Sequence, residues 1–263
     1  MQNFFITTFL LSLLVLVACN SGTDQTNNKG GTPLTEEMYK AELEKQKIEY
    51  ALMELNLRAT IAQKTLDIHS DKNWSKEDPA QFKMHDDTNN NAAFDILKKN
   101  NKAYNHNDNK NLRRKFYLAL EYHTDSITSF GLILNKLAEG AVEQPPNPQY
   151  KLLETIVDKV TALSTNYFET AFIPLTNKKD KLNSLSIDDL ESLQTHFRDL
   201  DEKRQIIRHR ADAIQNKFKD PQGNIGQQDQ LIKHIDDNKK EFIESFAAIE
   251  QIAKEIKNIL DTI

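Results

Sequence analysis

The sequence has a single cysteine, Cys19, and only seven glycines and seven prolines in 263 residues. A lone cysteine excludes a disulfide within the chain and a metal site built from several thiolates. Apart from Gly131 and Pro174, the glycines and prolines are confined to an N-terminal stretch and three loops. The segments between these loops are long and free of helix-breaking residues, which is typical of an all-helical protein.

The chain also has no excess of positive charge. It carries 34 lysines and arginines against 39 aspartates and glutamates, a formal net charge of −5. A nucleic-acid-binding protein would show a basic stripe, and a body that lies on anionic lipid would carry a basic cluster. We therefore expect no nucleic-acid partner and no membrane contact by the folded body.

The sequence motifs of common enzymes are missing too. A phosphate-binding glycine loop, a dinucleotide fingerprint, a nucleophile elbow and a zincin helix would each be recognisable, and none occurs. Asn105, Asn107 and Asn109 alternate like the start of a calcium loop. That motif fails, because Lys110 stands where glycine is required and Phe116 where a bidentate glutamate is required. We expect no enzymatic activity, no cofactor and no metal site.

The most informative stretch that is present is Leu16-Val17-Ala18-Cys19, which closes an apolar run from Phe4 to Val17. This run is too short to span the roughly 30 Å of hydrocarbon in a bilayer. Apolar residues at the N-terminus followed by a small residue and cysteine predict a bacterial lipoprotein signal. We expect cleavage between Ala18 and Cys19 and lipidation of Cys19. The alternative is a plain secretory signal with an incidental Cys19, since the first residues carry no Lys or Arg.

These features predict the organisation of the chain. Residues 1–18 form the signal peptide, and residues 19–33 form the lipidated cysteine with a flexible tether. The tether is rich in Asn, Gly, Thr and Ser and has too few apolar residues to fold. Residues 34–263 form a single all-helical domain. Each acyl CH₂ buried in the membrane contributes about 0.8 kcal/mol, so several chains on Cys19 would anchor the protein permanently, and the lipid would be its only membrane contact.

Apolar residues at helical spacing predict an all-α fold, an antiparallel bundle of five to six mostly long helices. Thr35 and Ser186 are predicted N-caps, and Pro174 is expected to kink or end its helix. The loop of residues 71–91 contains Trp74, which either packs against the end of the bundle or belongs to a functional loop. The predicted helices cover residues 35–69, 92–100, 112–140, 149–176, 187–219 and 227–263.

Arg204, Arg208 and Arg210 form a basic cluster in this acidic chain. They are candidate partner-binding residues of a protein or polyanion docking patch. The alternative is a solvated helix face in which Arg204 is buried and paired with a carboxylate. His123 lies on an apolar face and is expected to be a core residue, as are Phe242 and Phe246.

The segment FETAFIPLTNKKDKLNSLSIDDLESLQTHFRDL, residues 168–200, resembles a known family. Its matching elements are Phe172–Leu175, Lys178–Leu182 and the helix start Leu185–Glu191. They are similar to the virulent-strain-associated lipoproteins of Lyme-disease spirochaetes (Borrelia), paralogous family 54, a family that includes complement regulator-acquiring surface protein 1. The lipoprotein signal, the tether and the helical remainder fit the plan of this family.

The resemblance implies an all-helical outer-surface lipoprotein of the cell outer membrane with a role in immune evasion and virulence. Some members bind complement regulators such as factor H, or terminal complement components, and many do not. In the factor H binder the C-terminal helix takes part in dimerisation, so Ile256 and Leu260 are candidate contacts of a homodimer here. We expect a protein that binds a host protein. The alternative is a structural or spacer lipoprotein that faces the periplasm and has no host ligand.

Overall fold

The computed structural model describes residues 35–141, 147–220 and 225–263. The predicted cleavage site, Ala18 and Cys19, and the predicted tether lie outside these residues. The chain divides into two compact units, Met1–Glu42 and Leu43–Ile263, and each is described by itself. In the first unit, the hydroxyl of Thr35 accepts a hydrogen bond from the backbone N–H of Met38 at 3.3 Å. Thr35 therefore caps the first helix, as its sequence context predicts.

Helices dominate the described residues, and this confirms the predicted all-α class. Within the described part of the chain six helices have ten residues or more, in agreement with the five to six expected. They are α2 (Glu36–Ser70), α4 (Lys110–Ala119), α5 (Thr124–Ala138), α6 (Pro148–Ser164), α8 (Ile187–Lys219) and α9 (Gln228–Leu260). The shorter elements are η2 (Pro79–Phe82), α3 (Ala93–Ile96), β1 (Lys98–Lys99), β2 (Lys102–Ala103), η3 (Asn107–Asn109), η4 (Thr165–Phe172), α7 (Ile173–Lys178) and η5 (Lys179–Ser184).

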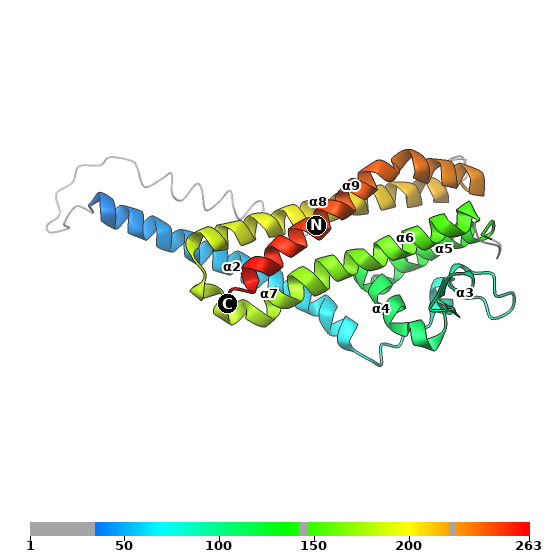
Figure 1. The fold of residues 1–263 in the computed structure, drawn as a ribbon, viewed down its shortest axis with the longest axis horizontal. Coiled ribbons are helices and arrows are strands. Elements are labelled where there is room, and N and C mark those ends of the chain that lie inside the picture. Colours follow the sequence, from blue (N-terminus) through cyan, green and yellow to red (C-terminus); the bar gives the residue numbers. More distant parts are fainter. Residues whose placement is uncertain (1–34, 142–146, 221–224) are drawn as a thin grey trace. The chain divides into compact units, whose positions relative to one another are not determined.

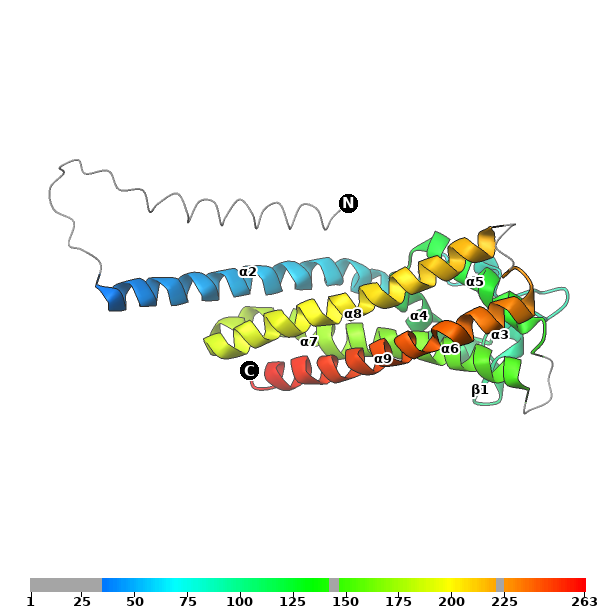
Figure 2. The same cartoon turned by 90° about the horizontal axis from the view of Figure 1, so that it is seen from above.

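The antiparallel pair α8 and α9 forms one side of the core of the second unit (Figures 1 and 2). Ser186 caps α8, accepting a hydrogen bond from the backbone N–H of Asp189 at 3.1 Å. Helix α9 also packs on η4, α6 and α7. Each helix buries a row of apolar residues: Leu190, Leu193, Phe197, Leu200, Ile207 and Ile214 from α8, and Leu231, Ile235, Ile249, Ala253, Ile256 and Leu260 from α9.

The single helix predicted over residues 112–140 is wrong, because the chain breaks between α4 and α5. Glu121 and Tyr122 have left-handed backbone angles, with φ of 53° and 58°. Non-glycine residues adopt this region at a cost of about 1 kcal/mol or more. Burial of the Tyr122 side chain offsets this cost, and its hydroxyl donates to the carbonyl oxygen of Arg114 at 3.1 Å. The break turns His123 outward, so the predicted core histidine is exposed at the start of α5.

The helix predicted over residues 92–100 is also shorter than expected. Helix α3 covers only Ala93–Ile96, and a small antiparallel hairpin of β1 and β2 follows it. The two residues of its turn, Asn100 and Asn101, have φ of 53° and 64°. Two positive φ values are what a type I′ hairpin turn requires, and asparagine tolerates them better than most residues. The strands have two residues each, too few to give an alternating pattern in the sequence.

The helical path predicted over residues 149–176 is present, but its hydrogen bonding changes on the way. Helix α6 passes into the π-helix η4, which passes into α7. The N–H of Ile173 bonds to the carbonyl of Phe168, five residues earlier. Pro174 then lies in the first turn of α7, where its missing N–H costs nothing. Pro174 therefore follows the end of η4 and does not terminate the helical path.

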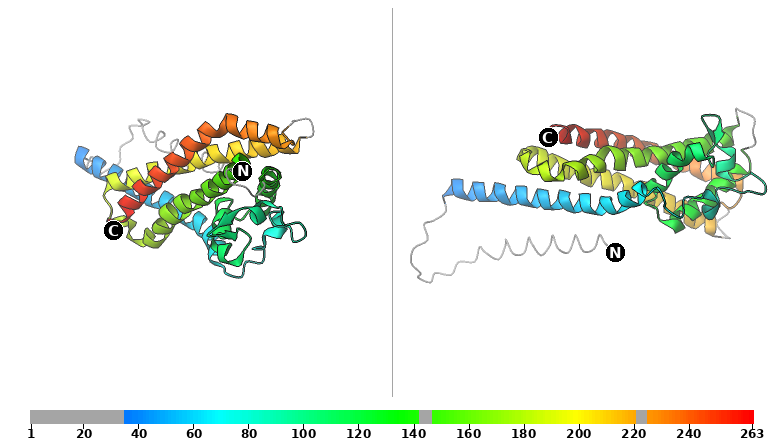
Figure 3. Two further views of the ribbon diagram at one scale, coloured as in Figure 1. Left: turned by 45° about the vertical axis from the view of Figure 1, so that its right-hand side comes forward. Right: turned by 90° about the horizontal axis from the view of Figure 1, so that it is seen from below.

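The segment between α2 and α4, residues 71–109, gathers around η2, α3 and the hairpin (Figure 3). We call this segment the cap. It packs on α5 at Gly131, where an added Cβ would lie well inside van der Waals contact with the carbonyl oxygen of Phe82 and 2.9 Å from Cγ of Met84. The close approach of the cap to α5 therefore requires glycine at this position.

Substitution of Gly131 by alanine tests this packing. In a helix free of contacts, alanine would be about 1 kcal/mol more favourable than glycine. Here we expect Gly131→Ala to lower the free energy of unfolding by about 1–3 kcal/mol, because the backbone of Phe82 must move. Gly226→Ala is the control, since nothing lies within 4 Å of its added Cβ, and a change within about 0.5 kcal/mol is expected. Urea denaturation measures both. Equal stability of the two variants would contradict the close approach.

Candidate functional site

Arg204, the first residue of the predicted basic cluster, is engaged within the chain. Only 12% of its side chain is exposed, and it forms an ion pair with Glu121 at 2.6 Å. Its guanidinium carbon lies 4.5 Å from the ring centroid of Tyr167, in the π-helix. The Tyr167 hydroxyl donates to Asp201 at 2.6 Å, and Asp201 also pairs with Arg58 of α2. Arg204 is thus a largely buried residue paired with a carboxylate, the alternative weighed for this cluster.

Arg208 and Arg210 do not join Arg204 in one patch. Successive residues of a helix are rotated by about 100°, so Arg210 points away from the face that Arg204 and Arg208 share. Arg210 pairs with Glu241 on the neighbouring helix α9. Arg208 is exposed, and within the described part of the chain it makes no ion pair. Of the three arginines, only Arg208 is left for an external partner.

The candidate dimer contacts at the C-terminus are buried in the monomer. Ile256 and Leu260 are 0% exposed. They belong to the hydrophobic core, and the carbonyl of Leu260 accepts a hydrogen bond from Nζ of Lys178 at 2.8 Å. A second chain cannot reach these side chains while α9 keeps this packing. Phe242 and Phe246 are partly buried against the core, with ring centroids 6.5 Å apart.

Trp74, in the first loop of the cap, packs against the helices. Its ring lies edge-on to Tyr122 at 4.7 Å between centroids and is stacked with Phe82 at 6.1 Å. The guanidinium carbon of Arg114 lies 5.5 Å from the ring centroid of Trp74. Arg114 also donates to the carbonyls of Ile68 and His69 at the end of α2, each at 2.6 Å. This cluster fixes the start of the cap to α2 and α4.

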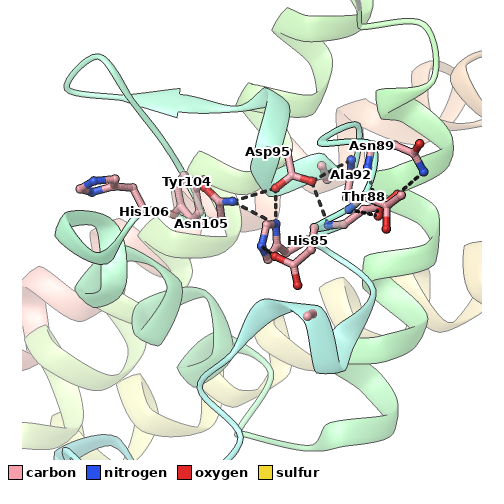
Figure 4. A network of polar contacts seen from close by, with 12 residues as sticks. His85, Thr88, Asn89, Ala92, Asp95, Tyr104, Asn105 and His106 are labelled. Carbon is pink, nitrogen blue, oxygen red and sulfur yellow. Dashed lines mark hydrogen bonds and ion pairs between the residues drawn. The ribbon is translucent and has the colours of Figure 1, made fainter.

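A polar network centred on Asp95 fixes the rest of the cap (Figure 4). The Asp95 side chain is 2% exposed. One carboxylate oxygen lies 2.5 Å from Nδ1 of His85 and accepts a hydrogen bond from the Asn105 amide at 2.8 Å. The other oxygen accepts from the backbone N–H groups of Asp86 and Ala92, at 3.0 and 3.1 Å. Asp95 therefore joins the loop, helix α3 and the segment after the hairpin.

His85 lies between two carboxylates. Its Nε2 is 2.7 Å from Asp87, while Nδ1 faces Asp95. Burial alone lowers the pKa of His85, but the hydrogen bonds and charges of Asp95 and then Asp87 outweigh it, so the pKa is raised above its usual 6.5. With both ring nitrogens engaged, His85 has no free nitrogen to act as a base toward a substrate. The network holds the loop in place. The sequence analysis did not predict this network, because His85, Asp95 and Asn105 are separated in the chain and no local motif connects them.

An open groove of about 900 Å³ lies between the cap and α5. Asn135 connects its two sides: its carbonyl oxygen accepts from the N–H of Ala93 at 2.9 Å, and its amide donates to the carbonyl of Lys83. Leu132, which is 43% exposed, supplies an apolar contact. Glu139, directly after the end of α5, supplies a charge. A mixed lining of this kind suits the side chains of a protein partner.

The described residues contain no group of three or more His, Cys, Asp or Glu side chains placed to hold a metal ion. None of their helices combines the length and the apolar character needed to cross a membrane.

Comparison with known proteins identifies the family. The family model described as Borrelia Bbcrasp-1 domain containing protein matches residues 71–261. The chain belongs to this family. The match covers the cap, its groove and the helices from α4 to α9, and it leaves out α2. Comparison with curated proteins finds no match.

The Bbcrasp-1 domain of this chain has the fold of several solved Borrelia surface proteins. The Lyme disease associated outer surface protein BBA65 from Borrelia burgdorferi is 20% identical, with a TM-score of 0.62 over 79% of this chain and 98% of that one. The Borrelia burgdorferi outer surface lipoprotein BBA64 is 19% identical, with a TM-score of 0.62 over 83% and 97%. BSA64 of Borrelia spielmanii is 20% identical, with a TM-score of 0.63 over 82% and 96%. At these identities the likeness shows the fold.

The raised pKa of His85 predicts a pH-dependent contribution to stability. Because the folded state holds the proton more tightly than the unfolded state, this contribution is complete below about pH 6.5 and is lost as the pH rises through the raised pKa. We expect the stability difference between the native chain and His85→Gln to shrink as the pH rises above about 6.5. His69 and His234 have lowered pKa values and opposite slopes, which cancel in this difference. A difference that does not vary with pH would contradict the prediction.

The burial of Ile256 and Leu260 in the monomer leads to a prediction about stability. Leu260→Ala should lower the free energy of unfolding by about 2–5 kcal/mol, because it opens a cavity in the monomer core. Ile243→Ala is the matched control on the same helix, since Ile243 is 56% exposed, and a change of less than about 0.5 kcal/mol is expected. Thermal or urea unfolding at several protein concentrations measures both. A Leu260→Ala effect that appears only at high concentration would mean that Leu260 contacts a second chain.

Proposed function

We propose that this protein is a surface-exposed lipoprotein of the bacterial outer membrane that binds a host protein, a complement component or regulator, in immune evasion. The observation that carries the proposal is family membership over residues 71–261, together with the same fold in Borrelia proteins described as outer surface proteins and as an outer surface lipoprotein. The lipoprotein signal that ends at Cys19 supports the same location.

The groove between the cap and α5 is the surface that we assign to the host protein. Other candidates are engaged within the chain: Arg204 and Arg210 pair with glutamates, and Ile256 and Leu260 are buried. The groove, in contrast, is open and presents Leu132 beside polar side chains. Its walls are held by the Asp95 network and by Asn135, so little conformational entropy is lost when a partner binds.

Labelling with palmitate tests the anchor. We expect labelled palmitate to enter the native chain and not Cys19→Ala, because the sulfur of Cys19 is the acceptor of the lipid. In intact cells, protease added from outside should remove the native protein, whereas a spacer lipoprotein facing the periplasm should survive. A periplasmic protein of the same cells serves as the control for membrane integrity. Survival of this protein together with the control would contradict surface exposure.

Capture from human serum tests the ligand and the groove. The native chain should retain an identified complement component or regulator, such as factor H or a terminal component. Leu132→Glu places a charge in the groove and should weaken capture by about tenfold or more, the size of effect of a central interface residue. Ile243→Glu introduces the same charge at an exposed position of α9, and it should leave capture unaltered.

Each other outcome of this experiment has a definite meaning. Absence of any complement protein from the captured fraction would contradict the proposed function. Capture that survives Leu132→Glu and is lost in Arg208→Glu would move the contact from the groove to α8.

A further inference from the structure

One wall of the groove is a turn, residues 86–91, and a single atom holds both of its ends. The backbone N–H groups of Asp86 and Ala92 donate to the same carboxylate oxygen of Asp95, at 3.0 and 3.1 Å. Beyond these ends, the flanking chain is fixed to α5 through Asn135. The ends of the turn therefore stay in place, and only the part between them can change its position.

The part between the ends has a single attachment outside the turn. Residues 87–91 are exposed, and their backbone N–H groups that form hydrogen bonds donate to Asp86, within the turn. Among the described residues, the one ion pair or hydrogen bond that ties them to a point outside the turn joins Asp87 to Nε2 of His85, at 2.7 Å. The His85 ring therefore determines how firmly the middle of the turn is held.

This ring can hold two carboxylates only while it carries two protons (Figure 4). Its Nδ1 lies 2.5 Å from Asp95, and its Nε2 lies 2.7 Å from Asp87. An ionised carboxylate accepts hydrogen bonds and cannot donate them. A neutral imidazole has one N–H, so one of its nitrogens must then present a lone pair to a carboxylate. The imidazolium, in contrast, donates to both.

Burial determines which of the two carboxylates is released. The Asp95 side chain is 2% exposed, whereas the Asp87 side chain is 86% exposed. An unpaired buried acceptor bears its full desolvation cost, but an exposed carboxylate replaces its lost partner with water. The neutral ring therefore keeps its proton on Nδ1. Asn105, 3.0 Å from Nδ1, donates to Asp95 and carries no charge that would reverse this choice.

We propose that His85 is a pH-sensitive clamp on the wall of the groove: its imidazolium holds the turn closed through Asp87, and loss of the Nε2 proton releases the middle of the turn. Burial lowers the pKa of His85, but the hydrogen bonds and charges of Asp95 and then Asp87 outweigh it and raise the pKa above 6.5. The clamp is therefore closed below about pH 6.5 and opens as the pH rises through the raised pKa. This inference goes beyond the proposed function, because it concerns the groove whatever binds there.

The other charges around the groove are held elsewhere. The Asp86 carboxylate senses the charge of the ring, but it accepts a hydrogen bond from the Asn89 amide at 2.9 Å, within the turn. Glu139 pairs with Lys136 of α5 at 2.7 Å. Lys83, before the turn, is exposed. The charges that shift the pKa of the ring are those of Asp95 in α3 and of Asp87 in the turn.

Hydrogen exchange of the full-length chain in detergent solution tests the clamp. Rates are measured from about pH 5.5 to about pH 8.5 and corrected for the intrinsic rate at each pH. Protection of the amides of Thr88, Asn89 and Asn90 should fall by about two- to fivefold as the pH rises, the size of effect of an ion pair with an exposed member. Protection that does not change with pH would overturn the proposal.

Asp87→Asn should abolish this pH dependence. A neutral amide can donate to Nε2 or accept from it, so it fits both charge states of the ring. Because Asp87 is exposed, the variant should fold normally. Asp108→Asn is the matched control, since Asp108 is an exposed carboxylate 3.5 Å from another histidine of the cap, His106. It should keep the native pH dependence. Equal behaviour of the two variants would overturn the assignment to Asp87.

Nitrogen chemical shifts of the histidine rings test which proton is lost. Above its raised pKa, His85 should be the Nδ1–H tautomer, which is the less common form of free histidine, and comparison with His85→Gln identifies its signals. An Nε2–H tautomer would mean that Asp87 stays bound, and it would overturn the proposal. Neither measurement needs a partner in the groove, so failure here is separable from failure of the proposed function.

Discussion

The packing of helix α9 on its own chain determines which surfaces of this protein remain free. Its apolar stripe runs from Leu231 to Leu260 and is covered by α8, η4, α6 and α7. Because burial of apolar area is the main favourable term in folding, these side chains cannot serve the monomer core and a second chain at once. Contact with other molecules must therefore use surfaces other than this stripe. The open groove beside α5 is one such surface.

A second set of constraints comes from charges that meet at the π-helix. Arg58, Asp201 and Tyr167 connect α2, α8 and η4, and Arg204 adds the turn between α4 and α5 through Glu121. Buried ion pairs contribute little net stability, because desolvation offsets their attraction. Removing one member leaves its partner unpaired, which is costly. This network therefore fixes how the helices are aligned more than it adds to their stability. π-Helical turns are often found where such local requirements outweigh regular hydrogen bonding.

Patterns within single segments predicted the fold well. The caps at Thr35 and Ser186 are local features, and the structure confirms them. The break at Tyr122 and the hairpin turn at Asn100 were not predictable, because they depend on contacts with other segments. The candidate site was harder still. A carboxylate partner for Arg204 was foreseen, but Glu121 comes from the unpredicted break, and the groove needs α5 and the cap side by side. The same fold occurs in Borrelia surface proteins that are only 19–20% identical to this chain. This agrees with a fold that depends on the pattern of apolar and capping residues more than on their identities.

The glycine that seats the cap on α5 has a consequence for how this sequence can change over time. A surface position such as Ile243 can be replaced without moving the backbone, so new variants are accessible there one substitution at a time. Position 131 has no such freedom, because any side chain meets the backbone of Phe82. Replacement of Gly131 would need a simultaneous change in the cap near Phe82. Mutational diversity among descendants of this chain should therefore accumulate around this contact while leaving the contact itself alone.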